Sequence, residues 1–119
     1  MNRLLILGTL LLTSQLQANE ADVIKVRVEC RVDCNFHVTL KHDDTGWEHY
    51  ANQWDVVAPD GTVLGSRVLY HPHVNEQPFT RSLSGVKVPA GIHQVTIRAQ
   101  DSVHGYGGVE QQVDLPANR

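Results

Sequence analysis

Short runs in which apolar and polar residues alternate follow one another along most of the chain. In the two clearest runs the apolar residues take every second position: Phe36, Val38 and Leu40 in one, and Val95, Ile97 and Ala99 in the other. A period of two is typical of β-strands that bury one face. Segments with strand character lie at residues 23–28, 35–42, 54–58, 62–70, 79–88, 92–101 and 109–115. No segment shows a convincing helical period, so the pattern predicts an all-β chain of about seven strands.

Turn-forming residues separate these segments and favour one architecture. Pro59-Asp60-Gly61 and Pro89-Ala90-Gly91 each combine a proline that presets φ with a glycine that accepts left-handed backbone. Short strands at this spacing predict an immunoglobulin-like antiparallel β-sandwich with Trp54 in its core. The alternation slips at Gly65-Ser66 and Ser84-Gly85, where we expect a bulge and a break between two short strands. A small barrel is the alternative, because strand count alone does not distinguish closure from two packed sheets.

Residues 1–18 have the layout of a secretory leader. Arg3 precedes an apolar run from Leu4 to Leu12, and polar residues then lead to Ala18. The run is too short to span a bilayer, so we expect cleavage after Ala18 and a single β-sandwich domain over residues 19–119. No cysteine lies near the cleavage point and no second apolar stretch follows, so neither a lipid anchor nor a transmembrane anchor is expected. The mature protein is expected in the periplasm or outside the cell.

The two cysteines, Cys30 and Cys34, lie close together in a chain that should reach an oxidising compartment. This setting favours a disulfide bond between them. Two metal-binding thiolates are the alternative, but the spacing is longer than that of zinc knuckles and no second cysteine pair exists. We therefore expect a disulfide that clasps the hairpin between the first two strands.

The composition argues against two functional classes. The formal net charge is −3 and no run of lysine or arginine occurs, whereas phosphate recognition requires a concentrated positive surface. Nucleic acid is therefore not an expected partner. The serines lack the glycine context of a nucleophile elbow, so a hydrolytic enzyme is not indicated.

Histidines are concentrated between the strands. If successive strands are antiparallel, the loops alternate between two ends of the domain, and those at 43–53, 71–78 and 102–108 share one end. This end would then hold His42, His49, His71, His73 and His104, together with Asp101. Two further histidines, His37 and His93, lie on strands and should face solvent or pair locally.

The predicted histidine-rich end has the chemistry of a metal site. Neutral imidazole is the commonest protein ligand for zinc, copper and iron, and a carboxylate can complete the set. His42 extends the inward row of residues 36–40 and Asp101 extends that of residues 95–99, so both should converge at the mouth of the sandwich. Without a thiolate, copper or zinc suits such a site better than iron. The alternative is that these histidines hydrogen-bond loop backbone, which is the commoner role for any one of them.

The same residues resemble the site motifs of a known family. His42, then His49-Tyr50 followed by Trp54, and much later His104-Gly105-Tyr106, are similar to the iron-binding motifs of superoxide reductases of the desulfoferrodoxin type, which are small immunoglobulin-like domains. The resemblance implies a metal ion held by His42, His49 and His104. The spacing from tyrosine to tryptophan is one residue longer here, and Asp101 stands where the family has a cysteine. Because that thiolate is the axial ligand on which the family's chemistry depends, Asp101 argues against reductase activity. Apart from these motifs, the chain resembles small secreted bacterial proteins.

Aromatic residues expected at the same end support a second hypothesis. They are Trp47, Tyr50, Tyr70, Phe79 and Tyr106, with the acidic Glu76 among them. Aromatic side chains with a polar handle suit contacts with a peptide, a glycan or a partner protein. A non-enzymatic accessory module is therefore the alternative to metal binding, and neither hypothesis calls for an enzymatic activity.

Overall fold

The computed structural model describes residues 19–117, so the predicted leader lies outside the described part of the chain. The described residues form eight strands: β1 (Asp22–Cys30), β2 (Cys34–Lys41), β3 (Ala51–Val57), β4 (Val63–Val68), β5 (Phe79–Val86), β6 (Gln94–Asp101), β7 (Gly105–Tyr106) and β8 (Gln111–Asp114). All pairings between them are antiparallel, which confirms the all-β prediction. Over residues 19–117 there is no helix long and apolar enough to cross a bilayer.

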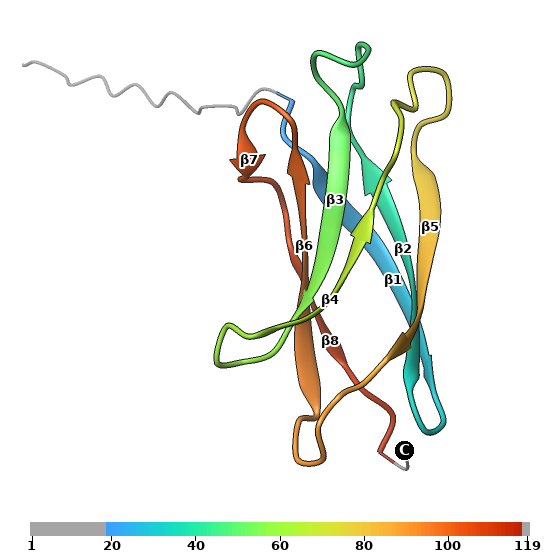
Figure 1. The fold of residues 1–119 in the computed structure, drawn as a ribbon, viewed down its shortest axis with the longest axis vertical. Coiled ribbons are helices and arrows are strands. Elements are labelled where there is room, and N and C mark those ends of the chain that lie inside the picture. The colour runs from blue at the N-terminus through green and yellow to red at the C-terminus, as the bar shows by residue number, and fades with distance from the viewer. Residues whose placement is uncertain (1–18, 118–119) are drawn as a thin grey trace, which may run out of the picture.

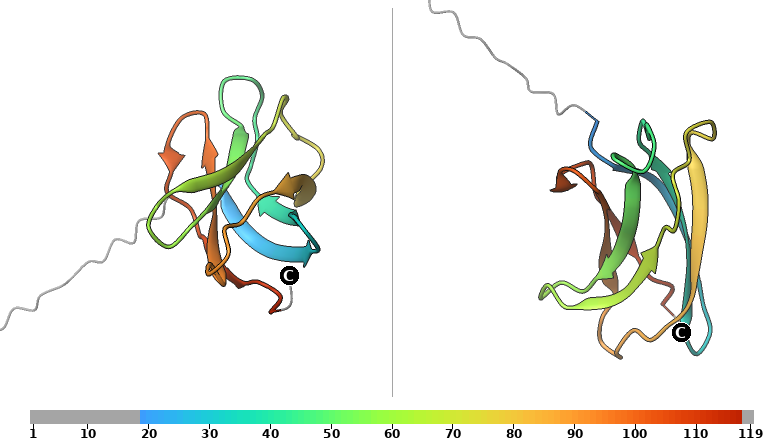
Figure 2. Two further views of the ribbon diagram at one scale, coloured as in Figure 1. Left: turned by 60° about the horizontal axis from the view of Figure 1, so that its bottom comes forward. Right: turned by 45° about the horizontal axis from the view of Figure 1, so that its top comes forward.

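The strands form two sheets that face each other as a sandwich (Figures 1 and 2). One sheet has the order β1-β2-β5, and the other has the order β4-β3-β6. Both β7 and β8 pair with the free edge of β6, at successive segments of that strand. The described strands pair within two separate sheets, and the chain passes from one sheet to the other after β2, after β4 and after β5. This arrangement is the predicted sandwich and not the alternative small barrel.

The inward rows of the two sheets build one core. Its largest fully buried apolar side chains come from β1, β2, β3, β5 and β6: Val23, Phe36, Val38, Leu40, Trp54, Val56, Phe79, Val95 and Ile97. The alternation therefore placed the core faces of β2 and β6 correctly, and Trp54 is completely buried as expected. Apolar side chains on both inner faces exclude water from the space between the sheets, which is the main stabilising contribution in such a fold.

Two details differ from the sequence-based expectation. The segment from Phe79 to Val86 is one strand and not two, although Gly85 within it adopts left-handed backbone with φ of 73°. The pairing with β2 is irregular there but resumes at Val86 opposite Cys34. In addition, Gly105–Tyr106 forms the short strand β7 inside a segment expected to be a loop, because it pairs with the end of β6.

Cys30 and Cys34 form the predicted disulfide, which closes the hairpin between β1 and β2. The two residues are also directly opposed in the β1–β2 register. Figure 1 places this hairpin at the end of the sandwich opposite the β2–β3 loop. The disulfide is therefore a local clasp far from the histidine-rich loops.

Replacement of both cysteines by alanine should lower the free energy of unfolding by about 2 kcal/mol, because such a short loop restricts the unfolded chain only modestly. Urea denaturation of the double variant measures this value. A loss above about 5 kcal/mol would contradict the local role of the clasp.

Candidate metal centre

Three loops meet at one end of the sandwich, as the predicted alternation of loops required. They are the β2–β3 loop, the β4–β5 loop and the β6–β7 turn, all at the top of Figure 1. Ser102 joins two of them, because its amide donates to Tyr50 O at 2.9 Å and its hydroxyl accepts from the Tyr50 amide at 3.0 Å. The backbone thus holds the segments that carry His49 and Asp101 side by side.

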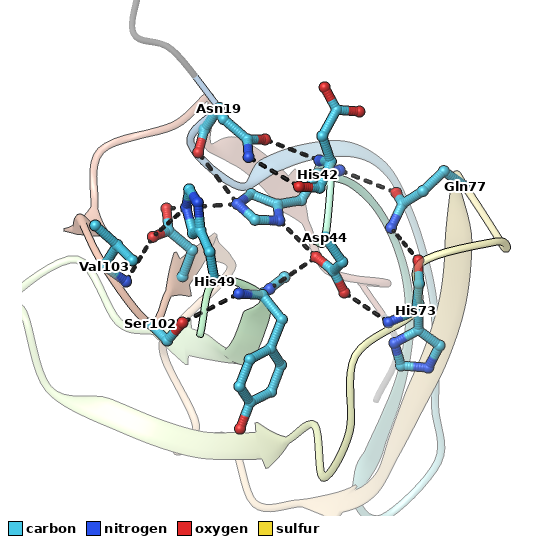
Figure 3. Close-up of polar contacts among 12 residues, drawn as sticks. Asn19, His42, Asp44, His49, His73, Gln77, Ser102 and Val103 are labelled. Carbon is cyan, nitrogen blue, oxygen red and sulfur yellow. Dashed lines mark hydrogen bonds and ion pairs between the residues drawn. The ribbon is translucent and has the colours of Figure 1, made fainter. Parts of the chain in front are cut away.

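His42 follows β2 directly and continues the inward row of that strand, so its side chain is buried. Its Nδ1 lies 2.5 Å from Asp44 Oδ1, and its Nε2 lies 3.1 Å from the carbonyl oxygen of Asn19 (Figure 3). An ionised carboxylate and a carbonyl oxygen can only accept, so the His42 ring is the donor in both contacts. Loss of the Nε2 proton would leave Nδ1–H on Asp44 and turn Nε2 into a candidate metal ligand.

His49 is held by a tight turn at the tip of the β2–β3 loop. The Thr45 amide donates to His49 O at 3.0 Å, and the His49 amide donates to Gly46 O at 3.1 Å. Gly46 has φ of 144°, and a Cβ atom at this position would lie 2.9 Å from Glu48 Oε1, so the turn favours glycine. The His49 ring meets the rings of His42 and His104 edge to face, at centroid distances of 4.9 Å and 5.0 Å.

Asp101 ends β6 and continues its inward row, which buries the carboxylate completely. Its Oδ1 accepts backbone hydrogen bonds from Val103 at 2.9 Å and from His104 at 2.7 Å. Burial works to raise the pKa of Asp101, but the hydrogen bonds from the His104 and Val103 amides, together with the hydrogen bond and charge of the His104 side chain, lower the pKa overall. Asp101 is therefore an ionised carboxylate with lone pairs still available to a cation.

His42, His49 and Asp101 bring three candidate ligand atoms to one point. Each residue offers an atom that lies within 4.8 Å of the other two. His49 Nε2 is 3.2 Å from Asp101 Oδ1, and His42 Nε2 is 3.8 Å from Asp101 Oδ2. Ligand atoms at 2.0–2.2 Å from a tetrahedral zinc ion are separated by roughly 3.4 Å. The two separations, which involve different oxygens of Asp101, lie on either side of that value, and the three candidate atoms lie within 4.8 Å of one another, so the side chains would have to draw together to bind an ion.

His104 lies beside this group but is not part of it. Its Nδ1 is 3.2 Å from Asp101 Oδ1, and its side chain is about one-third exposed. It is placed to orient Asp101 and to cover the candidate site on the solvent side.

His73 lies on the far side of Asp44 from His49 (Figure 3), and it forms a separate pair with His71 at a ring centroid distance of 4.7 Å. The His73 ring stacks on Phe79 at a centroid distance of 4.0 Å, and Arg81 Nη2 lies 2.8 Å from His73 Nε2. A guanidinium can only donate, so His73 Nε2 accepts this bond and is not free for a metal ion. Burial, together with the positive charge of Arg81, lowers the pKa of His73.

Two residues that the sequence did not single out connect the loops. Asp44 Oδ1 also accepts from the Ala51 amide at 3.0 Å, and Asp44 Oδ2 accepts from the His73 amide at 2.7 Å. Gln77 accepts from the His42 amide and donates to His73 O, each at 3.0 Å. These buried polar contacts fix the loops around His42. The sequence signal that could have found Asp44 is its place two residues after His42, which continues the alternation of inward-facing positions.

The residues of the predicted aromatic surface are divided. Trp47 and Tyr70 are exposed by 65% and 73%, and Trp47 contacts the Tyr50 ring edge to face. Phe79, in contrast, starts β5 with its side chain in the core, so its predicted surface position is wrong. Tyr106 donates its hydroxyl to Asp55 on the outer face of the second sheet, and Glu76 lies 3.3 Å from Arg81.

Comparison with known proteins gives one informative relationship. No protein-family model matches the chain, and no solved structure matches it. A protein of Halomicrobium mukohataei described as "Putative lipoprotein" is 42% identical over 104 residues, which cover 86% of this chain and 51% of that protein. The chain thus spans about half the length of this relative.

Substitution of Asp44 by alanine should cost about 3–5 kcal/mol of folding free energy, because two backbone amides and the His42 ring would lose a buried acceptor. Urea denaturation provides the value. Asp43→Ala is the matched control, because the exposed Asp43 hydrogen-bonds only through its backbone. The control should stay within about 0.5 kcal/mol of the native protein, and equal losses in both variants would contradict the role given to Asp44.

The lowered pKa of His73 predicts a pH dependence of stability. Below pH 6.5, the ordinary pKa of histidine, His73 is protonated in the unfolded chain but stays neutral in the folded protein until a lower pH. Stability from this group is therefore present above pH 6.5 and is lost as the pH falls toward the lower folded-state pKa. Unfolding of metal-free protein between pH 7.5 and 5 should show a shallower slope for His73→Gln. The exposed His93, changed to glutamine, should keep the native slope, and an unchanged slope in His73→Gln would refute the assignment.

Proposed function

We propose that this protein is an extracytoplasmic metal-binding β-sandwich in which His42, His49 and Asp101 bind one transition-metal ion. The proposed location is supported by the leader-like residues 1–18 and by the description of the Halomicrobium relative as a lipoprotein. The proposed role is metal carriage, since three side-chain ligands leave coordination positions open for exchange.

The carrying observation is that His42, His49 and Asp101 each direct one candidate ligand atom to a common point. His42 Nδ1–H is directed at Asp44, and Nε2 faces Asn19 O and Asp101 Oδ2, so an ion that displaced the Nε2 proton would lie between this nitrogen and Asp101. His49 Nε2 is buried and makes no hydrogen bond among the described residues, although Asp101 Oδ1 is 3.2 Å away. A cation at the centre would satisfy all of these atoms at once.

Asp44 suits the role of an outer-shell partner. A metal-binding histidine commonly donates its second ring nitrogen to a carboxylate, which orients the ring and makes it a stronger ligand. The 2.5 Å contact between His42 Nδ1 and Asp44 Oδ1 provides this arrangement before any ion binds. The ligand His42 therefore loses little side-chain freedom on binding.

The donor set favours copper or zinc. Two imidazoles and one carboxylate suit both metals, and copper(II) forms the most stable complexes among divalent first-row ions. Iron(II) also binds two histidines and a carboxylate, so it is the third candidate. The likeness to superoxide reductases stays a resemblance of motifs, and reductase activity is not expected of this chain. Asp101 supplies an oxygen where that chemistry uses a thiolate, so carriage is the simpler function.

The exposed aromatic residues support a second candidate function. Trp47, 65% exposed and in contact with Tyr50, lies in the loop that carries His49. Such a pair suits contact with a partner protein or glycan. If this were the main function, Trp47→Ala would abolish partner capture and chelators would have no effect.

The metal proposal is tested on mature protein purified without an affinity tag. We expect one copper or zinc ion per chain by elemental analysis, and at least a hundredfold weaker Cu²⁺ binding in His42→Ala and His49→Ala, measured by competition with a chromophoric chelator. His93→Ala is the control, because His93 is exposed. Substoichiometric metal that ignores the two site substitutions would exclude the proposal.

A further inference from the structure

His73 holds the β4–β5 loop against the rest of the sandwich. Among residues 70–78 it is the one that is buried, with 6% of its surface exposed. Its amide donates to Asp44 Oδ2 at 2.7 Å, and its carbonyl oxygen accepts from Gln77 Nε2 at 3.0 Å (Figure 3). Its ring stacks on Phe79 with an angle of 12° between the two planes. Both the backbone and the ring of His73 therefore fix the path of this loop.

The His73 ring has to be neutral to make its one polar contact. Arg81 Nη2 lies 2.8 Å from His73 Nε2, and a guanidinium can only donate, so Nε2 must keep its lone pair. The single hydrogen of the neutral ring is then on Nδ1. That nitrogen is buried and has no hydrogen-bond partner among residues 19–117. The hydrogen bond from Arg81 thus exists only while the ring is neutral.

A proton taken up by His73 would turn this attraction into a repulsion. Nε2 is the one basic nitrogen of the neutral ring, so the proton has to bind at the atom that accepts from Arg81. Nε2 then becomes a second donor, and two positive groups face each other across 2.8 Å. Because His73 is buried, water screens this repulsion only weakly.

The other charged groups that face His73 do not offset the repulsion. His71 adds a further positive charge when it is protonated, since its ring centroid lies 4.7 Å from that of His73. Two carboxylates act the other way, but Glu76 is already paired with Arg81 at 3.3 Å, and Asp44 already accepts hydrogen bonds from several segments. Burial and the charges of Arg81 and His71 therefore prevail over Glu76 and Asp44 and lower the pKa of His73.

We propose that His73 is a pH-sensitive anchor: its neutral ring holds the β4–β5 loop closed, and uptake of a proton releases residues 71–77 from Phe79 and Asp44. The two sheets stay folded when the loop opens, because β4 pairs with β3 and β5 pairs with β2 along their lengths. Acid thus opens the histidine-rich end of the sandwich from the side of the β4–β5 loop.

An open loop also affects the surroundings of His42. It withdraws the His73 amide from Asp44, and it withdraws Gln77, which accepts from the His42 amide at 3.0 Å. Asp44 then orients the His42 ring less firmly, so an ion bound by His42 would leave more readily in acid. This consequence rests on the metal-binding function proposed above, whereas the anchor itself does not.

The anchor is tested by NMR on isotope-labelled, metal-free protein of residues 19–119 between pH 7.5 and 4.5. The carbon shifts of the His73 ring report its protonation, and hydrogen exchange reports the protection of its amide. We expect this protection to fall at least tenfold, with its midpoint at the pH where the ring takes up its proton. The Ala58 amide, which donates to Thr62 O in the β3–β4 turn, should keep its protection and so exclude global unfolding.

His73→Gln is the matched variant, because a glutamine oxygen can accept from Arg81 but does not titrate. Its loop should stay closed over the whole range, whereas the control His93→Gln should open as the native protein does. If glutamine does not hold the loop even at pH 7.5, the two midpoints in the native protein decide. A ring that stays neutral down to pH 4.5, a protonated ring whose amide keeps its protection, or a native opening midpoint in His73→Gln would overturn the anchor.

The effect on the metal centre is measured separately, by chelator competition for Cu²⁺ at pH 7.5 and pH 5.5. Protonation of the ligands weakens binding in the native protein and in His73→Gln alike, so the difference between the two proteins isolates the anchor. We expect the native protein to lose at least threefold more affinity than His73→Gln. Equal losses would remove the link between the loop and the metal centre, and absence of Cu²⁺ binding by both proteins at pH 7.5 would refute the metal function and not the anchor.

Discussion

The buried carboxylate of Asp44 is the contact on which the histidine-rich end of the sandwich depends. It accepts hydrogen bonds from the His42 ring, from the Ala51 amide at the start of β3, and from the His73 amide in the β4–β5 loop. A carboxylate removed from water without such donors would cost several kcal/mol. The three segments are therefore fixed relative to one another, and the orientation of His42 follows from this constraint.

Two other buried carboxylates show how the partners of an acid indicate its role. Asp55 is surrounded by dedicated donors: Gln53, Ser66, Arg98 and Tyr106. Burial works to raise its pKa, but these hydrogen bonds outweigh burial and lower it, so Asp55 is a satisfied structural group that joins β3, β4, β6 and β7. Asp101 has backbone donors and histidine rings around it, and no arginine or lysine of residues 19–117 pairs with it. Its surroundings suit a carboxylate that shares a cation with histidines.

The alternation of apolar residues was sufficient to predict the sandwich and to bring His42 and Asp101 to one end, because both residues extend inward rows of regular strands. It could not predict contacts within the loops. Arg81 of β5 donates a hydrogen bond to His73 Nε2 in the β4–β5 loop, and this contact keeps that nitrogen from binding a metal ion. Asn19 reaches His42 although the two residues are 23 positions apart in sequence. Such contacts depend on the path of irregular backbone, which has no periodic signal.

Anomalous diffraction at the copper absorption edge, from crystals of the mature copper-loaded protein, tests the central claim most directly. The account predicts one strong peak about 2.0–2.2 Å from His42 Nε2, His49 Nε2 and an oxygen of Asp101. A peak beside His71 and His73, or no peak in protein that carries a full equivalent of copper in solution, would contradict it.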